Sequence, residues 1–309
     1  MISLLMNVYN EETEWLIQAV ESILNQTYQN FEIIIVIDNP ELSIENKNYL
    51  LKVSKNDERV KFLFNSENQG TARCANLGLE MAKGDYIARL DADDIAMPER
   101  FEVELDYFDH NNIDMVASNV IIIDRDGREI YRRPKNTEDP MKYLPYTNMI
   151  LHSSVMIKTS VLRELGGYRN FRSGEDYDLW LRMITKDKKI AIIDQYLVKY
   201  RIRDNGISIQ NRLKQYYSNK YIAKLYNERL KVGKDSFSEE NLQKYLSLKK
   251  ITDKKNKRCV ITMELLFQAK RRLSDKKISF IMPLAKAFIL FPSVTLSVMT
   301  NVIKKSHVK

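Results

Sequence analysis

The chain has 309 residues, of which 44% are hydrophobic and 29% are charged, a composition typical of a globular protein with one large or two smaller domains. Its two cysteines, Cys74 and Cys259, lie far apart and outside any CxxC pattern. This argues against a zinc site or a disulfide-rich secreted scaffold and favours a reduced, cytoplasmic protein. The net charge of +8 divides unevenly, since residues 1–210 carry −8 and residues 211–309 carry +16. We therefore expect two parts with different roles, residues 1–210 and residues 211–309.

Strands and helices alternate along the first part. Short apolar runs with few charges predict strands at residues 2–9, 31–37, 60–64 and 86–90. Apolar residues at helical spacing, and one polar segment, predict helices at residues 11–25, 43–56 and 70–82. This alternation predicts an α/β fold with a mostly parallel sheet covered by helices on both faces. Ligands of such sheets bind beyond the carboxyl ends of the strands.

Acidic and polar residues follow three of these strands. Asp91, Asp93 and Asp94 come directly after the strand at 86–90, while residues 7–11 and Asp38 end earlier strands. Three carboxylates in one turn repel each other, but they suit a hard cation such as Mg²⁺, which is held by one or two carboxylates plus substrate phosphates. The alternative is an acidic loop in which Asp94 caps the helix predicted at 98–110. Convergence of the strand ends favours a metal–diphosphate site.

A second acidic pair lies farther along the chain. Residues 115–123 and 129–133 predict a strand pair, residues 154–157 and 191–201 predict further strands, and residues 160–165 and 176–185 predict helices. Glu175 and Asp176 follow Gly174 at the start of the last helix, where the helix dipole favours a charged carboxylate. Either acid could simply cap the helix. A carboxylate that faces a metal–diphosphate site could instead remove a proton from an attacking hydroxyl.

The second part reads as long, Lys-rich helices. A stripe of tyrosines at residues 216–226 fits core packing or, alternatively, a sugar platform. Basic clusters at 249–277 precede the apolar residues 278–303, which Pro283, Lys286 and Pro292 interrupt, so a straight membrane-spanning helix is not expected. A basic segment beside an apolar one is typical of the interface of an anionic bilayer. The alternative is that these helices pack on the first part.

Several motifs share the order and spacing of a known family. They are Val8–Glu11, Ser22–Thr27, Phe31–Asp38, Asn68–Asn76, Ala88–Asp94, Gly166–Tyr168, Gly174–Trp180 and Tyr200–Arg201. In these motifs residues 1–210 resemble family 2 glycosyltransferases of the bacterial kind that builds capsules and O-antigens. The resemblance implies the GT-A fold, a Rossmann-like and mostly parallel central sheet flanked by helices, here followed by a C-terminal helical region.

The resemblance also implies roles for single residues. The nucleotide and its diphosphate would be bound by Asn7, Tyr9, Glu11, Asp38, Arg73, Asp91, Arg201 and Arg203. Asp38 would accept a hydrogen bond from the imide N–H of the base, which favours uracil. Asp93, with Asp91, Asp94 and His152, would hold Mn²⁺ or Mg²⁺, although His152 fits a hydrogen-bonded structural role equally well. Asp176 would be the general base, with Glu175 beside it.

The implied function is an inverting, metal-dependent glycosyltransferase, a hexosyl- or N-acetylhexosaminyltransferase. It would use a UDP-sugar and a hydroxyl of a glycan or of an undecaprenyl-type lipid-linked saccharide, in the synthesis of cell-surface polysaccharide. The protein would be cytoplasmic and peripheral at the inner face of the plasma membrane through residues 211–309. Three positions depart from the family pattern: Asn7 replaces Pro, Asp38-Asn39-Pro40 replaces Asp-Asp-Gly-Ser, and Arg203 replaces His. The departures at Asp38-Asn39-Pro40 and at Arg203 put the base and diphosphate contacts in question.

Three other classes of protein were weighed against this one. A sugar-phosphate nucleotidylyltransferase should have a Gly-rich phosphate loop after the first strand, and a dinucleotide-binding dehydrogenase should have GxGxxG there; residues 7–11 contain no glycine. A non-catalytic basic adaptor for lipid or nucleic acid would explain the second part only. The charge of −8 on the first part would repel nucleic-acid phosphates, so we expect no nucleic-acid partner.

Overall fold

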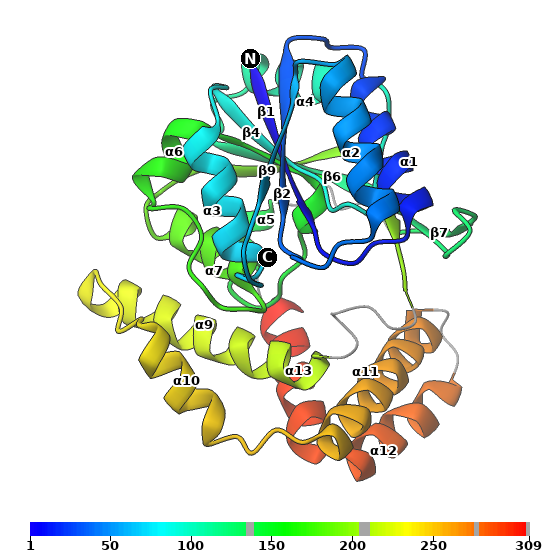
Figure 1. Ribbon diagram of the computed structural model, residues 1–309. Helices are drawn as coiled ribbons and strands as arrows, with labels where there is room; N and C mark the ends of the chain where they lie inside the picture. The colour runs from blue at the N-terminus through cyan, green and yellow to red at the C-terminus, as the bar shows by residue number, and fades with distance from the viewer. Residues whose placement is uncertain (134–138, 204–210, 275–277, 307–309) are drawn as a thin grey trace. The chain divides into compact units, whose positions relative to one another are not determined.

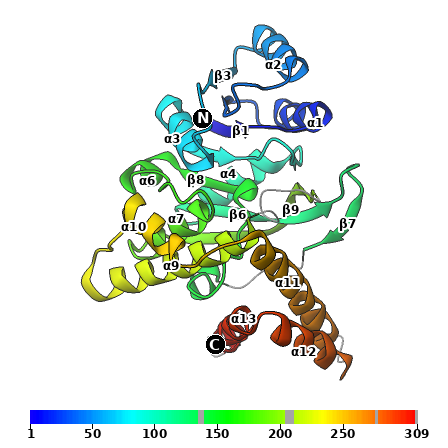
Figure 2. The ribbon, with the colours of Figure 1, turned by 60° about the horizontal axis from the view of Figure 1, so that its bottom comes forward.

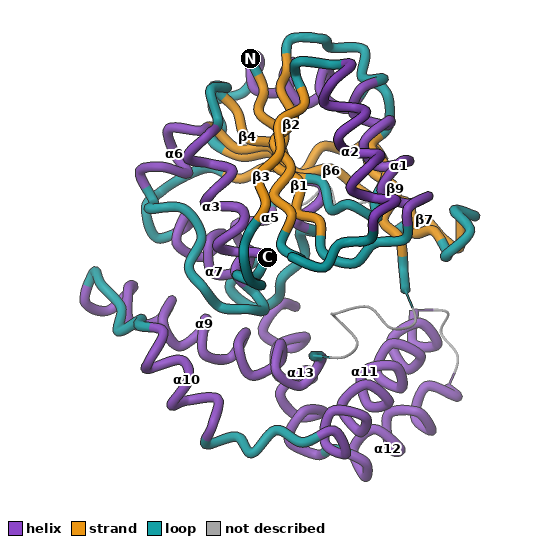
Figure 3. Tube along the Cα trace, in the orientation of Figure 1, coloured by secondary structure: helices purple, strands orange, loops and turns teal. Residues whose placement is uncertain are grey.

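The computed structural model describes residues 1–133, 139–203, 211–274 and 278–306. It divides into two compact units, the first formed by residues 1–141 and 149–203 and the second by residues 142–148 and 204–309. In the described parts of the chain, every strand belongs to the first unit, and the second unit consists of helices and loops (Figure 3). The assignment of catalysis to residues 1–210 and of membrane association to residues 211–309 stays a prediction.

The first half of the sheet is parallel. Its elements are β1 (Ile2–Val8), α1 (Thr13–Leu24), β2 (Phe31–Ile37), α2 (Ile44–Asn56), β3 (Val60–Phe64), α3 (Thr71–Met81) and β4 (Tyr86–Arg89). The strands lie in the order β3-β2-β1-β4, and each neighbouring pair is parallel. Figure 1 shows α1 and α2 on one side of these strands and α3 on the other. The alternation predicted from the sequence is confirmed, with small shifts at the element ends.

The second half of the sheet is mixed. The remaining elements of the first unit and its boundary are β5 (Ile95–Ala96), α4 (Arg100–His110), β6 (Met115–Ile123), β7 (Glu129–Arg132), α5 (Pro140–Tyr143), the 3₁₀ turn η1 (His152–Ser154), β8 (Val155–Lys158), α6 (Thr159–Glu164), α7 (Glu175–Ile184) and β9 (Ile190–Arg201). The order continues β4-β8-β6-β9-β5, with the hairpin strand β7 paired to β6. β8 runs antiparallel to both β4 and β6. β6 and β9 are again parallel, so the second half of the sheet mixes both directions, whereas the first four strands are parallel as expected. The short strand β5 was not foreseen.

The hydrophobic core fixes where the strands end. All of β2 and nearly all of β1 are buried, and Leu16, Val20 and Ile23 of α1 pack in the same core. Each buried large aliphatic side chain contributes roughly 1.5–3 kcal/mol relative to exposure. In the register of the sheet, Val8 lies opposite Ile37, and Leu5 lies opposite Arg89. The segments that follow β1, β2 and β4 therefore leave the same edge of the sheet.

The second unit is a set of helices around a small core. They are α9 (Arg212–Val232), α10 (Glu239–Ser247), α11 (Asp253–Ser274), the 3₁₀ turn η2 (Ile278–Phe280), α12 (Ile281–Leu290) and α13 (Pro292–Ser306). Leu213, Cys259 and Val294 form the buried centre. The tyrosines pack in pairs, with ring centroids of Tyr221 and Tyr245 4.9 Å apart, which supports the core-packing interpretation. Among the described residues, none of the helices combines the length and the apolar character that crossing a bilayer requires.

Candidate functional site

The three aspartates between β4 and β5 have three different surroundings. The chain turns tightly here, with the amide of Asp94 donating to the carbonyl of Asp91 at 3.1 Å. The amide of Asp91 donates to Ser153 Oγ at 2.9 Å, which ties the turn to η1. The side chain of Asp91 is 42% exposed, whereas Asp93 is nearly buried and Asp94 is fully buried. Asp91 and Asp93 are therefore the carboxylates of this turn that a ligand could reach.

Asp94 anchors the turn to the neighbouring strand. Its Oδ1 accepts a hydrogen bond of 2.8 Å from the amide of Arg201 in β9. Burial, and then the nearby charge of Asp93, raise the pKa of Asp94 well above its ordinary value. This geometry favours a structural role. The expectation that Asp94 assists the metal stays a prediction.

A guanidinium group already sits on Asp93. Arg203 makes a short ion pair with the Asp93 carboxylate and a longer one of 3.4 Å with Glu11. The Arg203 guanidinium also lies 5.4 Å from the centre of the Trp15 ring. Burial raises the pKa of Asp93 to about 6, and Arg203 opposes that shift. The positively charged guanidinium of Arg203 thus lies on Asp93, the carboxylate that the sequence predicts to be the principal metal ligand.

The side chain of Arg201 makes several hydrogen bonds within the protein. It is buried, and its Nε donates to the carbonyl of Asp93 at 2.9 Å. Its Nη1 donates to the carbonyl of Arg125 at 2.7 Å, and its Nη2 donates to Gln18 at 2.7 Å. All three guanidinium nitrogens of Arg201 therefore donate hydrogen bonds, and the bond to Asp93 stabilises the acidic turn. These contacts favour a structural role for Arg201, and the diphosphate contacts expected of Arg201 and Arg203 stay predictions.

Arg89 is a site residue that the sequence argument missed. This fully buried side chain donates from Nη1 to the carbonyl of Leu5 at 2.9 Å and from Nη2 to Asp91 Oδ1 at 3.1 Å. It therefore orients Asp91 from beneath and supplies a positive charge under the acidic turn. The available signal was an arginine in an otherwise apolar, buried strand. The ring of Trp15 lies beside the Arg203 guanidinium, a contact that its place in the apolar pattern of residues 11–25 does not predict.

The predicted nucleotide side is built around Asp38. Its two oxygens accept three hydrogen bonds, from Asn65 Nδ2 at 2.8 Å, the Gln69 amide at 2.7 Å and the Gly70 amide at 2.8 Å. Gly70 precedes α3 with φ of 84°, a conformation that glycine adopts readily, and this turn presents both amides to the carboxylate. Asp38 thus holds the start of α3. The Cys74 side chain also interacts with Asp38, and the contact of Asp38 with a base stays a prediction.

Asn7, Tyr9 and Arg73 surround this carboxylate-anchored turn. Asn7 Nδ2 donates to the carbonyl of Thr71 at 3.1 Å, while its buried Oδ1 has no partner among the described residues. The ring of Tyr9 is exposed, and the Tyr9 amide donates to Glu11 at 2.7 Å. Arg73 Nη1, on α3, contacts Gln69 at 3.2 Å. An unused acceptor and an exposed ring at the end of β1 suit a base or ribose, and these assignments also stay predictions.

The second acidic pair begins α7. Gly174, with φ of 97°, lets the chain turn into the helix, and Asp176 Oδ1 accepts a hydrogen bond of 2.6 Å from the amide of Tyr177. Burial, and then the neighbouring Asp176, raise the pKa of Glu175 to about 7; Asp91 raises it further and Arg89 opposes the shift. The charge of Asp91 is therefore felt at Glu175. The acidic turn after β4 and the start of α7 belong to one electrostatic environment.

Tyr168, which is buried, and His152, which is partly buried, pair with each other near both acidic groups. His152 Nε2 lies 3.0 Å from the Tyr168 hydroxyl, and the two ring centroids are 5.2 Å apart. Burial and the charge of Arg89 lower the pKa of His152 well below its ordinary value, so the imidazole is neutral. Burial raises the pKa of Tyr168. These contacts favour the structural role of His152, and its part in metal binding stays a prediction.

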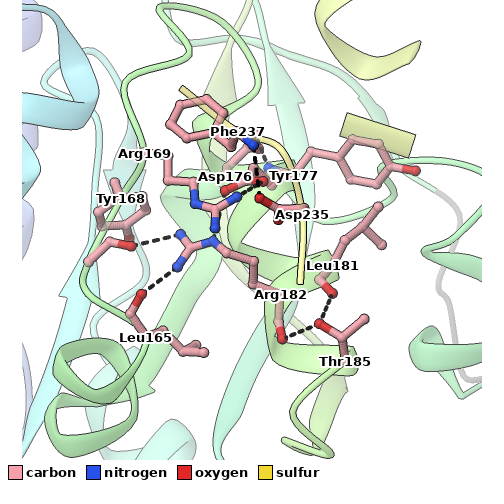
Figure 4. A network of polar contacts seen from close by, with 12 residues as sticks. Leu165, Tyr168, Arg169, Asp176, Tyr177, Leu181, Arg182, Thr185, Asp235 and Phe237 are labelled. Carbon is pink, nitrogen blue, oxygen red and sulfur yellow. Dashed lines mark hydrogen bonds and ion pairs between the residues drawn. The ribbon is translucent and has the colours of Figure 1, made fainter. Parts of the chain in front are cut away.

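A buried network fixes the position of α7. Arg182 donates from Nε to Asp178 at 2.8 Å, from Nη1 to the carbonyl of Leu165 at 2.6 Å and from Nη2 to the carbonyl of Gly167 at 2.7 Å (Figure 4). The side chain of Asn76 in α3 bonds both the amide and the carbonyl of Tyr168, at 2.8 Å each. Helix α7 is thereby tied to the turn that carries Tyr168, so Glu175 and Asp176 stand on a rigid support.

The raised pKa of Glu175 predicts a pH-dependent stability effect. The protonated carboxyl stabilises the fold below pH 4.5, the ordinary value, and this contribution is lost as pH rises through the folded value of about 7. Glu175→Gln should therefore gain stability relative to the unmodified protein between pH 4.5 and pH 7, with a melting temperature higher by a few degrees at the upper end. Thermal unfolding across this range checks it. Glu80→Gln, an exposed site on α3, serves as the control.

The acids fit a cation that brings other ligands with it. Within the described residues there is no cluster of three or more His, Cys, Asp or Glu side chains that could hold a metal ion alone. Asp91 and Asp93 nevertheless supply the one or two carboxylates that Mg²⁺ or Mn²⁺ takes from a protein when a diphosphate completes its shell. The ion pair between Arg203 and Asp93 shows that this carboxylate accepts a positively charged partner. The residues present therefore fit the group.

The fold and the site together define the class of the protein. A parallel half-sheet with an acidic turn after β4, continued by a mixed half-sheet, is the GT-A arrangement of glycosyltransferases. The family model described as "Glycosyl transferase family 2" matches residues 3–166. The chain belongs to glycosyl transferase family 2 and is a glycosyltransferase.

Individual relatives agree with this assignment. An uncharacterized glycosyltransferase of Methanocaldococcus jannaschii is 36% identical over 222 residues, which cover 70% of this chain and 76% of that protein. The O-antigen biosynthesis glycosyltransferase WbnJ of Escherichia coli is 31% identical over 220 residues, covering 70% and 85% of the two chains. Among solved structures, S. aureus TarS 1-349 in complex with UDP-GlcNAc is 16% identical with a TM-score of 0.59, and the match covers 96% of this chain and 83% of that one. That likeness concerns the fold.

Proposed function

We propose that this glycosyltransferase moves a sugar from a UDP-sugar to a hydroxyl of a glycan or lipid-linked saccharide, with inversion, in the synthesis of cell-surface polysaccharide. The observation that carries the proposal is that the turn η1 links the two acidic groups: Ser153 accepts the hydrogen bond from the amide of Asp91, and His152 of the same turn pairs with Tyr168, in the segment that leads to Glu175 and Asp176. The O-antigen role of the Escherichia coli relative supports the pathway, and the UDP-GlcNAc bound to the S. aureus protein supports the donor.

The donor is held by groups at the ends of β1, β2 and β4. Asn7, Tyr9 and Asp38 take the nucleoside, with Arg73 and Asp91 toward the diphosphate. Asp93, with Asp91, holds Mg²⁺ or Mn²⁺, which when bound offsets the negative charge of the diphosphate leaving group. Arg203 exchanges its ion pair with Asp93 for the phosphates, because a guanidinium pairs well with both kinds of anion.

The acceptor is activated by the acids of α7. Asp176 takes the proton from the attacking hydroxyl, and the oxygen attacks C1 of the sugar from the face opposite the diphosphate, which inverts the anomeric centre. Burial and the neighbouring Asp176 raise the pKa of Glu175 to about 7, so Glu175 gives up its proton less readily than an ordinary carboxyl group. The rigid support of α7 keeps this carboxylate in place.

The protein works, in this proposal, at the inner face of the plasma membrane, where an undecaprenyl-type acceptor would be found. The charge of +16 on residues 211–309 supports this location. Membership of the family excludes the non-catalytic adaptor and does not support the nucleotidylyltransferase, which was the other enzymatic alternative.

A donor screen tests the proposal. A panel of nucleotide sugars is incubated with the protein and Mn²⁺ or Mg²⁺, without acceptor, and release of free nucleotide is measured. We expect slow, cation-dependent release of UDP from one or a few UDP-sugars, and no release after addition of EDTA. Preference for another nucleotide would overturn the UDP assignment, and release indifferent to EDTA would overturn the metal.

Arg203 offers a separate prediction about the diphosphate. Arg203→Ala should weaken UDP binding by roughly 10–100-fold, the effect of losing one or two charge-assisted hydrogen bonds. Binding of uridine, which lacks the diphosphate, should not change. Calorimetric titration with both ligands measures the difference. An equal loss for both ligands would show that Arg203 supports the site as a whole rather than the phosphates.

A further inference from the structure

Helix α12 of the second unit turns its large apolar side chains outward. Ile281, Met282, Phe288 and Ile289 are exposed, whereas the buried positions of this helix are the smaller Pro283 and Ala287. The exposed residues, spaced at i, i+1, i+7 and i+8, form a single stripe along the helix. A helix that only packed in a water-soluble bundle would bury this stripe, so α12 presents an apolar face that needs a partner.

The same surface continues on the neighbouring elements. Helices α11, α12 and α13 pack together around Cys259 and Val294, and Figure 2 shows α12 and α13 following one another beside α11. Ile278 before α12 is 80% exposed, and Ile289 near its end is 78% exposed. Helix α13 adds a second outward stripe, made of Leu296, Met299, Val302 and Ile303. We call the stripes of α12 and α13, with Ile278, the apolar face.

The segment of the sequence that carries the apolar face is positively charged. Residues 251–309 contain 13 Lys and Arg but only 3 Asp and Glu. From residue 276 to the end of the sequence there are 6 lysines and no acid. A second copy of this chain would bring the same positive charge and would be repelled. An anionic bilayer complements both features, since its headgroups attract the lysines and its acyl boundary accepts the apolar stripes.

A hollow beside the apolar face has the chemistry of a lipid headgroup site. Arg258, Leu265, Lys286, Ile289 and Leu290 line a cavity of about 330 Å³. Arg258 Nε donates to the carbonyl of Leu290 at 3.0 Å, which places a guanidinium at the end of α12. Lys286 makes no ion pair within the described part of the chain. Two cations over an apolar wall suit a phosphate attached to a hydrocarbon chain.

We propose that the apolar face docks in the interface of a membrane that carries anionic phospholipids, with Arg258 and Lys286 pairing a lipid phosphate. The helices lie in the interface and do not span the bilayer, in keeping with the lengths of the described helices. This inference deepens the proposed function by naming the surface on which the acceptor is met. The test of this inference measures membrane binding alone, so its outcome does not depend on sugar transfer.

The experiment is sedimentation of the full-length protein with vesicles of phosphatidylcholine, or of phosphatidylcholine mixed with phosphatidylglycerol. The unmodified protein should sediment with the mixed vesicles, and less so at high salt. Ile289→Asp should lower the partition coefficient by about tenfold, as expected from the loss of one buried aliphatic side chain. Lys286→Glu should lower it by roughly tenfold on the mixed vesicles only.

Matched variants elsewhere in the second unit serve as controls. Leu248→Asp makes the same apolar-to-acid change at an exposed position next to α10, and Lys234→Glu makes the same charge reversal outside the face. Both should sediment like the unmodified protein, and circular dichroism confirms folding of each variant. Sedimentation unaffected by Ile289→Asp would overturn the proposal, as would absence of binding to mixed vesicles by the folded protein. A concentration-dependent dimer that Ile289→Asp dissolves would replace the membrane by a second copy. UDP release in the donor screen should be the same for Ile289→Asp, so failure of either proposal is recognisable by itself.

Discussion

Asp176→Asn should lower kcat for sugar transfer by at least ~10²-fold, the usual contribution of a general base. The amide of asparagine keeps the shape of the side chain and can still accept the hydrogen bond from the amide of Tyr177, but it cannot take a proton from the acceptor hydroxyl. Donor binding should change little, because the loss falls on the transition state. Steady-state kinetics with saturating donor and metal, together with UDP titration, separate the two effects.

Asp187→Asn is the control for this variant, since it makes the same change at an exposed position just beyond the other end of α7. It should retain full activity, and both variants should unfold at similar temperatures. Turnover of Asp176→Asn like that of the unmodified enzyme would remove Asp176 from the mechanism. A loss in donor affinity equal to the loss in kcat/KM would instead make Asp176 a donor-binding residue.

Asp93→Asn should abolish the gain in UDP affinity that Mn²⁺ provides. Removal of a direct ligand should weaken metal-dependent binding by about 100-fold or more, since even outer-shell partners cost 10–100-fold. The fold should tolerate the change, because burial raises the pKa of Asp93 to about 6 and the folded protein thus disfavours its charge. Calorimetric titration of UDP with and without Mn²⁺ measures the effect.

Asp85→Asn provides the matched control at the opposite end of β4. Its side chain is 79% exposed and forms an ion pair with the amino group of Met1. Exposed ion pairs of this kind contribute little free energy. Asp85→Asn should show the full Mn²⁺ dependence. If Asp93→Asn binds UDP with the same Mn²⁺ dependence, the cation is held elsewhere, and the assignment of Asp93 fails.

The parallel half of the fold could be predicted because its signals are local. β1 and β2 are apolar runs buried on both faces, and α1 carries its apolar residues at helical spacing, so period and length identify each element. The mixed half depends on pairings between distant segments. β8 inserts between β4 and β6, and the two-residue β5 exists only because it pairs with β9. No local pattern encodes either pairing.

The candidate site divides in the same way. The acidic turn and the Glu175–Asp176 pair could be singled out because their acids stand together, at the end of a predicted strand and at the start of a predicted helix. The arginines could not be assigned, since their roles depend on which acceptors surround them. Arg201 is buried and its side chain donates to four acceptors, whereas Arg203, two residues later, pairs with Asp93 and Glu11. Arg89 was overlooked because the sequence does not show that its buried side chain reaches Asp91.

A crystal structure with UDP and Mn²⁺ tests the central claim most directly, because anomalous scattering locates manganese without ambiguity. We expect a manganese peak within coordination distance of Asp93 and of the diphosphate, with Arg203 moved from Asp93 to a phosphate oxygen and Asp176 on the opposite wall of the same cleft. Manganese bound away from Asp93, or UDP seated on a surface that Asp176 does not face, would contradict the account.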